Sequence, residues 1–117
     1  MVNETGWVTM FEGVRRRIVA DGEHLMQILV EVRQGSVVVR HQHVHEQVSF
    51  VHAGRLRFDL GDRIIEAGPG ETVFIPSNVP HAVTALEDSV AIDTFSPPRA
   101  DFRSATPPDP SIYGRHT

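Results

Sequence analysis

Apolar and polar residues alternate along most of the chain between Trp7 and Phe95, and Gly, Pro, Asp or Asn interrupts the alternation at intervals of roughly eight to twelve residues. A period of two is typical of half-buried β-strands, and the enrichment in Val and Ile favours strands as well. No window carries the apolar stripe of an amphipathic helix. The pattern predicts strands over residues 15–19, 25–32, 37–43, 47–53, 55–60, 63–66, 72–75, 81–85 and 90–95.

The turns between these segments are also visible in the sequence. Gly61 and Asp62 separate two predicted strands and indicate a hairpin that places Leu56, Phe58 and Leu60 on one face. Many short strands without helices predict an all-β fold. We expect a sandwich or a barrel, and barrels or jelly rolls protect the sheet edges of such chains from pairing with other chains.

The chain length of 117 residues suits one domain with a substantial core, and neither an internal repeat nor a linker is visible. We therefore expect a single domain over residues 1–117, with a barrel core at about 7–96 and a Pro-rich C-terminal tail at about 97–117. Beyond about Arg103 we expect the tail to drape over the domain or to be disordered. The N-terminus resembles no signal peptide and no apolar run could span a bilayer, which predicts a cytoplasmic protein without a membrane partner.

The charge balance changes the list of expected partners. Eleven Lys and Arg residues against fifteen Asp and Glu residues give a formal net charge of −4. Nucleic acid is not favoured as a partner, because phosphate binding relies on clustered basic side chains, and the one basic run, residues 15–17, is expected at a solvated strand end. Cysteine is absent, so any metal ion would be held by His, Asp, Glu or Gln.

Four of the seven histidines lie in the segment RHQHVHEQVSFVHAG, residues 40–54. His41, His43, His45 and Gln47 fall on alternate residues, so an extended backbone would project all four side chains to one side. Imidazole nitrogens and amide oxygens are metal ligands, and several imidazoles buried together without an ion would leave polar groups without partners. The cluster therefore predicts a metal site. The isolated histidines, for which no direct role is expected, are His24, His52 and His116.

Two motifs in the centre of the chain carry a resemblance to a known family. The first runs from Gly35 through SVVVR, His41, Gln42, His43, VHE, Gln47 and VSFVHA to Gly54. The second runs from Gly70 through ETVFI, Pro76 and SNVP to His81. Their spacing is similar to that of the two cupin motifs, with Gln47 in place of the usual Glu and without the Asn that usually follows the second motif. The resemblance covers about 50 residues.

The resemblance to cupins implies a jelly-roll β-barrel that holds one divalent metal ion. The implied ligands are His41, His43, Gln47 and His81. His45 shares their face by alternation, but a turn near residues 44–46 is expected to break the alternation and to leave His45 beside the metal, in the substrate pocket. Zn, Ni, Fe, Mn and Cu all suit such a donor set. The neutral Gln47 leaves the full charge of the ion in the site, which favours Lewis-acid chemistry over dioxygen activation.

The last predicted strand and the residues after it, SVAIDTFSPPRADF at 89–102, carry a third pattern. Asp93 and Phe95 lie two apart on one face with Ala91, and Arg99 follows. Taken alone, Phe95 would be a core residue and Arg99 a surface charge. Together with the histidine motif, the pattern resembles the small cupins of pectin and alginate breakdown, which convert 4,5-unsaturated uronates to linear ketonized sugars. That resemblance implies Asp93 as the general acid/base, Phe95 as a wall of the sugar pocket and Arg99 as a substrate-holding residue.

The functional hypothesis is therefore a metal-dependent enzyme that acts on a small, oxygen-rich anionic substrate by Lewis-acid and general acid/base chemistry. One alternative is a non-catalytic sugar-binding or sensor cupin, which would not need Asp93. Another is an iron-dependent oxidative cupin, against which Gln47 argues. A homodimer is also expected. Small cupins commonly pair through a sheet edge or exchanged N-terminal strands, and residues 7–20 form an apolar edge segment.

Overall fold

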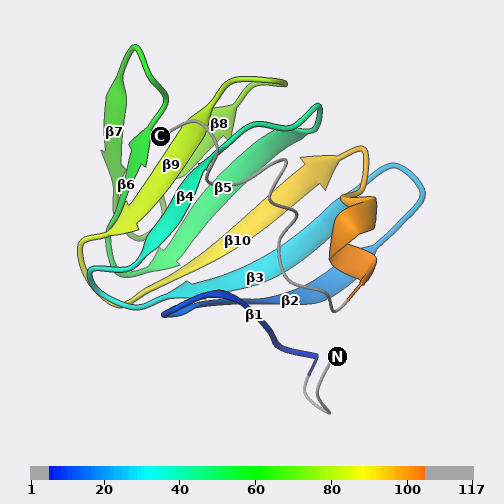
Figure 1. Cartoon of the computed structure of the whole chain (residues 1–117), viewed down its shortest axis with the longest axis horizontal. Coiled ribbons are helices and arrows are strands. Elements are labelled where there is room, and N and C mark those ends of the chain that lie inside the picture. The colour runs from blue at the N-terminus through cyan, green and yellow to red at the C-terminus, as the bar shows by residue number, and fades with distance from the viewer. Residues whose placement is uncertain (1–5, 105–117) are drawn as a thin grey trace.

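The computed structural model describes residues 6–104, and its strands form two antiparallel sheets that face each other (Figure 1). In chain order the elements are β1 (Val8–Phe11), β2 (Val14–Asp21), β3 (Met26–Val32), β4 (Val37–His41), β5 (Glu46–Ala53), β6 (Leu56–Asp59), β7 (Ile64–Ala67), β8 (Thr72–Ile75), β9 (His81–Ala85), β10 (Ser89–Ser96) and the 3-10 helix η1 (Ala100–Arg103). The larger sheet has the order β1-β2-β3-β10-β5-β8, and the smaller sheet has the order β4-β9-β6-β7. This all-β barrel confirms the predicted fold class.

The core lies between the two sheets and follows from the alternation in the sequence. Every second residue of β3 and β10 is buried, whereas the residues between them are partly exposed. Leu56, Phe58 and Leu60 are all buried, and β6 pairs with β7 as the predicted hairpin. Burial of one such apolar side chain contributes about 1.5–3 kcal/mol to folding, so the inward-facing positions fix the strand registers.

Two elements differ from the sequence-based expectation. The strand predicted over 37–43 ends at His41, so His43 lies in the loop that connects β4 to β5. The structure also contains β1, which pairs with β2 at the edge of the larger sheet and which the sequence pattern did not predict. β1 has four residues, too few to show a clear period of two.

The residues after β10 pack onto the barrel. η1 follows β10, and Phe102 within it is buried (Figure 1). Arg16 of β2, expected at a solvated position, is instead buried beneath this segment. Its guanidinium donates to the carbonyls of Phe102 and Ser104, both at 3.1 Å, and lies 4.3 Å from the Phe102 ring centroid. The rest of the predicted tail, with His116, lies outside the described residues.

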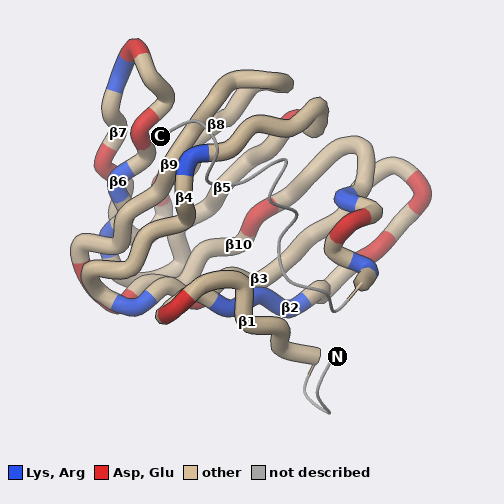
Figure 2. The backbone as a smooth tube through the Cα atoms, viewed as in Figure 1, with Lys and Arg blue, Asp and Glu red and all other residues tan. Residues whose placement is uncertain are grey.

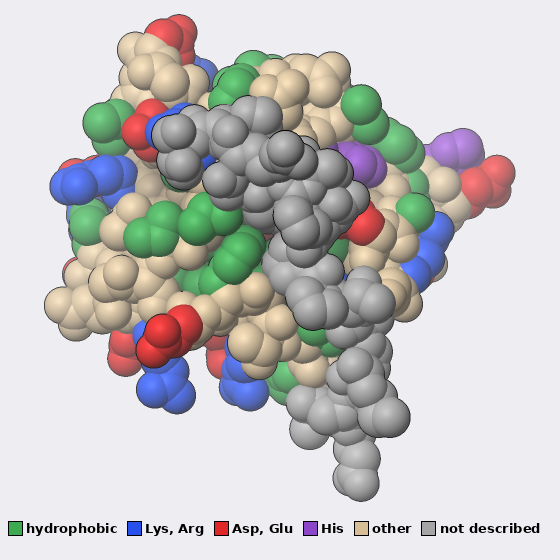
Figure 3. All heavy atoms as spheres, in the orientation of Figure 1, with side chains coloured by type: hydrophobic (Ala, Val, Ile, Leu, Met, Phe, Trp, Pro, Cys, Tyr) green, Lys and Arg blue, Asp and Glu red, His purple; other side chains and the backbone are tan. Residues whose placement is uncertain are grey.

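Charged side chains are dispersed over the surface. Arg15 and Arg17 of β2 are exposed. Figure 2 shows basic and acidic positions interspersed along the described part of the chain. Figure 3 shows apolar side chains exposed in patches between scattered acidic and basic groups. Within residues 6–104 there is no helix of the length and apolarity that would cross a membrane.

The free edge of the larger sheet bears on the predicted homodimer. β1 is the outermost strand of that sheet, as the expected pairing through residues 7–20 requires. Homodimerisation stays a prediction, which light scattering at micromolar concentration tests: a mass near twice 13.0 kDa supports it and a mass near 13.0 kDa contradicts it.

Candidate metal centre and cavity

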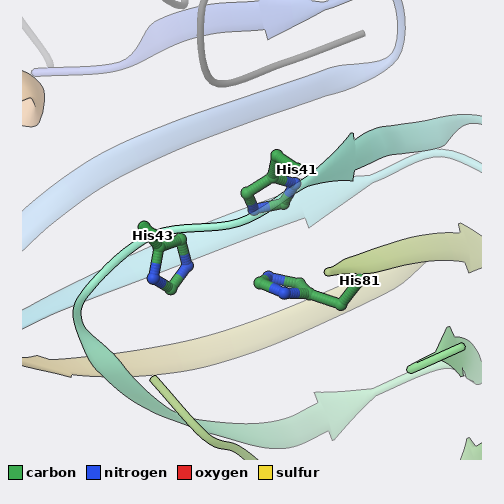
Figure 4. Close-up of side chains that lie close together, drawn as sticks. All are labelled: His41, His43 and His81. Carbon is green, nitrogen blue, oxygen red and sulfur yellow. The ribbon is translucent and has the colours of Figure 1, made fainter. Parts of the chain in front are cut away.

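Three histidines from different segments converge on one point between the sheets (Figure 4). His41 ends β4, His43 follows it in the loop, and His81 begins β9 directly opposite His41 in the strand register. Their exposed fractions are only 4%, 7% and 1%. Ring centroids lie 4.2 Å apart for His41 and His81, 5.1 Å for His43 and His81, and 5.5 Å for His41 and His43. One nitrogen from each ring lies within 4.8 Å of the other two.

Two hydrogen bonds tie the loop that carries His43 to the loop that precedes His81. The amide of Asn78 donates to the His43 carbonyl at 2.8 Å, and the Ser77 hydroxyl donates to the Val44 carbonyl at 2.6 Å. Asn78 has a φ of 62°, in the left-handed region that Asn tolerates better than most residues. These contacts hold His43 next to His41 and His81, which the strand register places opposite each other.

Each of the three rings has its Nδ1 next to a backbone carbonyl of a residue two positions away. The pairs are His41 with Val39 (2.8 Å), His43 with His45 (3.0 Å) and His81 with Val79 (2.8 Å). A carbonyl only accepts hydrogen bonds, so Nδ1 carries the proton and Nε2 presents a lone pair. The Nε2 of His81 is buried and has no hydrogen-bond partner within the described residues. Metal-binding histidines are oriented in this way.

The surroundings keep the imidazoles neutral. Burial, assisted by the neighbouring His81, lowers the pKa of His41 to about 2, and burial with the charge of Arg99 lowers the pKa of His43 to about 3. Burial also lowers the pKa of His81. Neutral rings that present an Nε2 lone pair are the form that binds a metal ion.

Gln47 of β5 completes the set of donors. Its amide nitrogen donates to Asp93 Oδ2 at 3.2 Å, which leaves its oxygen facing His43 Nε2 at 3.1 Å. Both of these facing atoms are acceptors, so a cation between them would replace repulsion by attraction. The donors of His41, His43, Gln47 and His81 therefore fit a divalent ion, and three imidazoles with one amide oxygen do not select among Zn, Ni, Fe, Mn and Cu.

Asp93 lies in the middle of β10, and its side chain is buried. Strand register sets it opposite Ser49 of β5, whose hydroxyl donates to Asp93 Oδ1 at 2.6 Å. Burial raises the pKa of Asp93 to about 6, against the opposing effects of the Ser49 hydrogen bond and the Arg99 charge. Its carboxyl group can therefore both release and take up a proton near neutral pH.

Ser49 is the site residue that the sequence reasoning missed. It lies two positions after Gln47 on the same inward face of β5. Alternation from Gln47 was the signal that could have found it. A lone Ser in an apolar strand otherwise carries little information about function.

A cavity of about 50 Å³ connects these groups. Its polar lining residues are His41, Gln47, Ser49, His81, Asp93 and Arg99. Most of the remaining wall is apolar and includes Phe58 and Phe95. A few polar groups that converge in an apolar cavity are typical of small-molecule sites.

Phe95 and His45 lie beside the histidine cluster. The buried Phe95 ring meets the His43 ring edge to face, with 5.8 Å between the ring centroids. The centroid of the His45 ring lies 6.4 Å from that of Phe95 and 5.3 Å from that of His43. His45 is half-buried in the loop that ends strand alternation, and burial lowers its pKa. The other two described histidines, His24 and His52, are exposed.

Arg99 is only 1% exposed, although it follows the last strand. Its guanidinium lies 5.2 Å from the Phe95 ring centroid and 4.0 Å from that of Phe102. Its Nε and Nη2 donate to the Asp101 carboxylate at 3.0 and 2.9 Å. Burial raises the pKa of Asp101, but the hydrogen bond and charge of Arg99 outweigh burial and hold it below its usual value.

Comparisons with known proteins agree with this geometry. A family model described as a cupin domain matches residues 28–94. The chain is 34% identical over 102 residues to the pectin degradation protein KdgF of Dickeya dadantii (strain 3937), which covers 86% of this chain and 93% of that protein.

Two solved structures are similar over most of their length. The structure of KdgF from Halomonas sp. has a TM-score of 0.77 and 36% sequence identity and covers 81% of this chain and 88% of its own. An RmlC-like cupin from Shewanella frigidimarina NCIMB 400 has a TM-score of 0.78 and 29% identity, over 82% and 86% of the two chains. The chain therefore belongs to the cupin family, and within that family it is similar to KdgF over most of its length.

Proposed function

We propose that this protein is a metal-dependent enzyme that converts 4,5-unsaturated uronates, such as pectin breakdown releases, to linear keto sugars. The observation that carries the proposal is the placement of Asp93, which hydrogen-bonds Gln47 and Ser49 in the cavity that His41 and His81 line. A binding protein would need the cavity but would not need a proton-transfer group there. The similarity to the pectin degradation protein KdgF supports the substrate class.

The proposed metal ligands are His41, His43, Gln47 and His81, and the ion when bound would supply Lewis-acid polarisation of substrate oxygens. Three of the ligands are neutral rings in the tautomer that presents Nε2, and the fourth presents an amide oxygen. The chain places no carboxylate among these donors.

The proposed reaction is an isomerisation, so it needs only proton transfers. The bond between C1 and the ring oxygen breaks as the C1 hydroxyl loses its proton, and the ring oxygen gains a proton to become an enol hydroxyl. The enol then accepts a proton at C4 and loses its hydroxyl proton, which gives a ketone at C5. Asp93 exchanges these protons with the substrate, because its pKa of about 6 makes both of its forms accessible.

Arg99 and Phe95 recognise the substrate in this proposal. A uronate carries one carboxylate, and a buried guanidinium can pair with it through two parallel hydrogen bonds. Phe95 lines the cavity next to Arg99 and provides an apolar wall for one face of the sugar. His45 lies at the same side and borders the substrate pocket.

The test is an assay of the metal-loaded protein with unsaturated galacturonate monomers. We expect the ultraviolet absorbance of the 4,5 double bond to disappear faster than in buffer, with a linear keto sugar as the product by NMR. Tight binding without turnover would favour a sugar-binding or sensor cupin. Consumption of dioxygen with an iron-loaded sample would favour an oxidative cupin.

A further inference from the structure

The Arg99–Asp101 pair is a bidentate contact within a very short segment. Asp101 Oδ1 accepts from Nε at 3.0 Å and Oδ2 accepts from Nη2 at 2.9 Å, so the carboxylate lies along one side of the guanidinium plane. The Asp101 side chain is 35% exposed, whereas that of Arg99 is 1% exposed. Arg99 thus faces the cavity, and Asp101 holds it from the side nearer the solvent.

The rings of Phe95 and Phe102 restrict the same guanidinium further. Their centroids lie 5.2 and 4.0 Å from its central carbon. A long arginine side chain has many rotamers, and bidentate recognition of a carboxylate requires one orientation of its planar group. A guanidinium that is already fixed loses less freedom when a ligand binds.

We propose that Asp101 is a positioning residue that holds Arg99 in the orientation that receives a substrate carboxylate, and thereby sets a preference for acidic over neutral sugars. The inference rests on the proposed function, which assigns the substrate carboxylate to Arg99. It adds to that site a residue that the sequence motifs did not include. Loss of Asp101 should weaken binding of acidic sugars and leave binding of neutral sugars unchanged.

The segment offers a matched control. Arg103 of η1 donates to Asp21 at 2.9 and 2.7 Å, so this second bidentate pair ties the same short helix to the end of β2. Asp21→Asn removes a carboxylate from that pair and does not change the Arg99–Asp101 pair. Arg16 still anchors the segment in both variants through the carbonyls of Phe102 and Ser104.

The experiment is titration calorimetry of the purified protein, with its metal content measured, against D-galacturonate and D-galactose. These probes differ by one carboxylate. We expect the wild type to bind galacturonate more tightly than galactose and Asp101→Asn to bind galacturonate roughly tenfold more weakly, with galactose unchanged. Asp101→Glu should recover part of the loss, and Asp21→Asn should match the wild type.

Three results would overturn the inference. Tighter binding of galacturonate to Asp101→Asn would mean that Asp101 blocks Arg99. An equal loss in Asp21→Asn would mean that the pair only anchors the segment. A wild type without preference for galacturonate would mean that Arg99 receives no carboxylate.

The two proposals can fail separately. Galacturonate lacks the 4,5 double bond, so its binding does not depend on turnover. If unsaturated uronates are not consumed but the Asp101→Asn effect on galacturonate is present, the proposed reaction is wrong and the positioning role stands. If turnover occurs, Asp101→Asn should raise KM with little change in kcat, and a change in kcat alone would contradict a role in carboxylate recognition.

Discussion

His41 and His81 are held by the backbone of two paired strands, whereas Arg99 is held by side chains of a short segment that follows the last strand. In the first region, strand register and three bonds to backbone carbonyls fix the rings. In the second, an ion pair and two aromatic rings fix the guanidinium. From this difference we expect a substitution in the histidine region to act through loss of a ring that the strands hold, and a substitution in the Arg99 region to act through side-chain contacts.

The sharpest test of the histidine region is His81→Ala. A missing ligand should reduce metal affinity by more than the roughly 10–100-fold that loss of an outer hydrogen-bond partner costs. Elemental analysis should then find no stoichiometric metal, and activity should be lost. The thermal midpoint should no longer fall on addition of a chelator, because metal binding to the folded state no longer contributes to stability.

His52→Ala is the control for this variant, because His52 is an exposed histidine of β5. It should retain metal and activity. Full metal content in His81→Ala would contradict the proposed site.

Asp93→Asn tests the position between the two regions. It should lower turnover by ~10²–10⁴-fold, the usual contribution of a general acid/base, while metal content and fold stay intact. Steady-state kinetics, elemental analysis and circular dichroism measure the three quantities. Asp62→Asn, in the exposed turn between β6 and β7, should behave as the wild type. Full activity in Asp93→Asn would remove the main support for an enzyme.

Arg99→Lys addresses the second region. It keeps the positive charge and loses the planar group, so the substrate KM should rise roughly 10- to 100-fold while metal content is unchanged. Because the carboxylate is bound in both the ground state and the transition state, kcat should change much less. Arg103→Lys, at the end of η1, is the control. An unchanged KM in Arg99→Lys would contradict a role of Arg99 in substrate binding.

Ser49→Ala gives the smallest expected effect. The Ser49 hydroxyl lowers the pKa of Asp93 by hydrogen-bonding its ionised form, so its removal should raise that pKa above about 6. If the reaction needs ionised Asp93, kcat/KM falls as the pH falls through this pKa. In Ser49→Ala this fall in kcat/KM should occur at a higher pH than in the wild type. At pH 6 the reduction should be roughly threefold, and it should approach roughly fivefold well below pH 6, as expected for a net hydrogen bond of ~1 kcal/mol.

The pH–rate profile of Thr94→Val provides the comparison for Ser49→Ala. Thr94 is the next residue of β10, so its side chain lies on the opposite face of the strand from Asp93. Its profile should match that of the wild type. A profile for Ser49→Ala that does not shift would show that Ser49 does not tune Asp93.

The two regions also differ in how much of them was predictable. The predicted strand over 81–85 placed His81 at a strand start, as observed, and period two placed Asp93 and Phe95 on one inward face. His41 was expected within a strand over 37–43 and is instead its last residue. His43 was expected inside a strand, but the strand ends two residues earlier. Alternation alone does not report where a strand ends, because the boundary depends on which partner strand is present.

The structure of the short segment after β10 could not be predicted from local sequence patterns. Its Pro-rich composition indicated a tail, and nothing local distinguishes Phe102 from an exposed residue. Arg16, in a run that suggested a solvated strand end, fixes this segment by bonds to carbonyls 86 and 88 residues away in sequence. Contacts of such sequence separation leave no periodic signal in either partner.

The sequence by itself therefore determined the all-β fold, the inward face of strands such as β6 and β10 and the residue types that gather around the cavity, because side-chain alternation and motif spacing are local properties of the chain. Only the tertiary structure decided that Ser49 supports Asp93 and that Asp101 and Phe102 frame Arg99. Strand register across the sheet placed the first pair. The packing of η1 against β2 and the cavity placed the second group, because these contacts exist only once distant segments have come together.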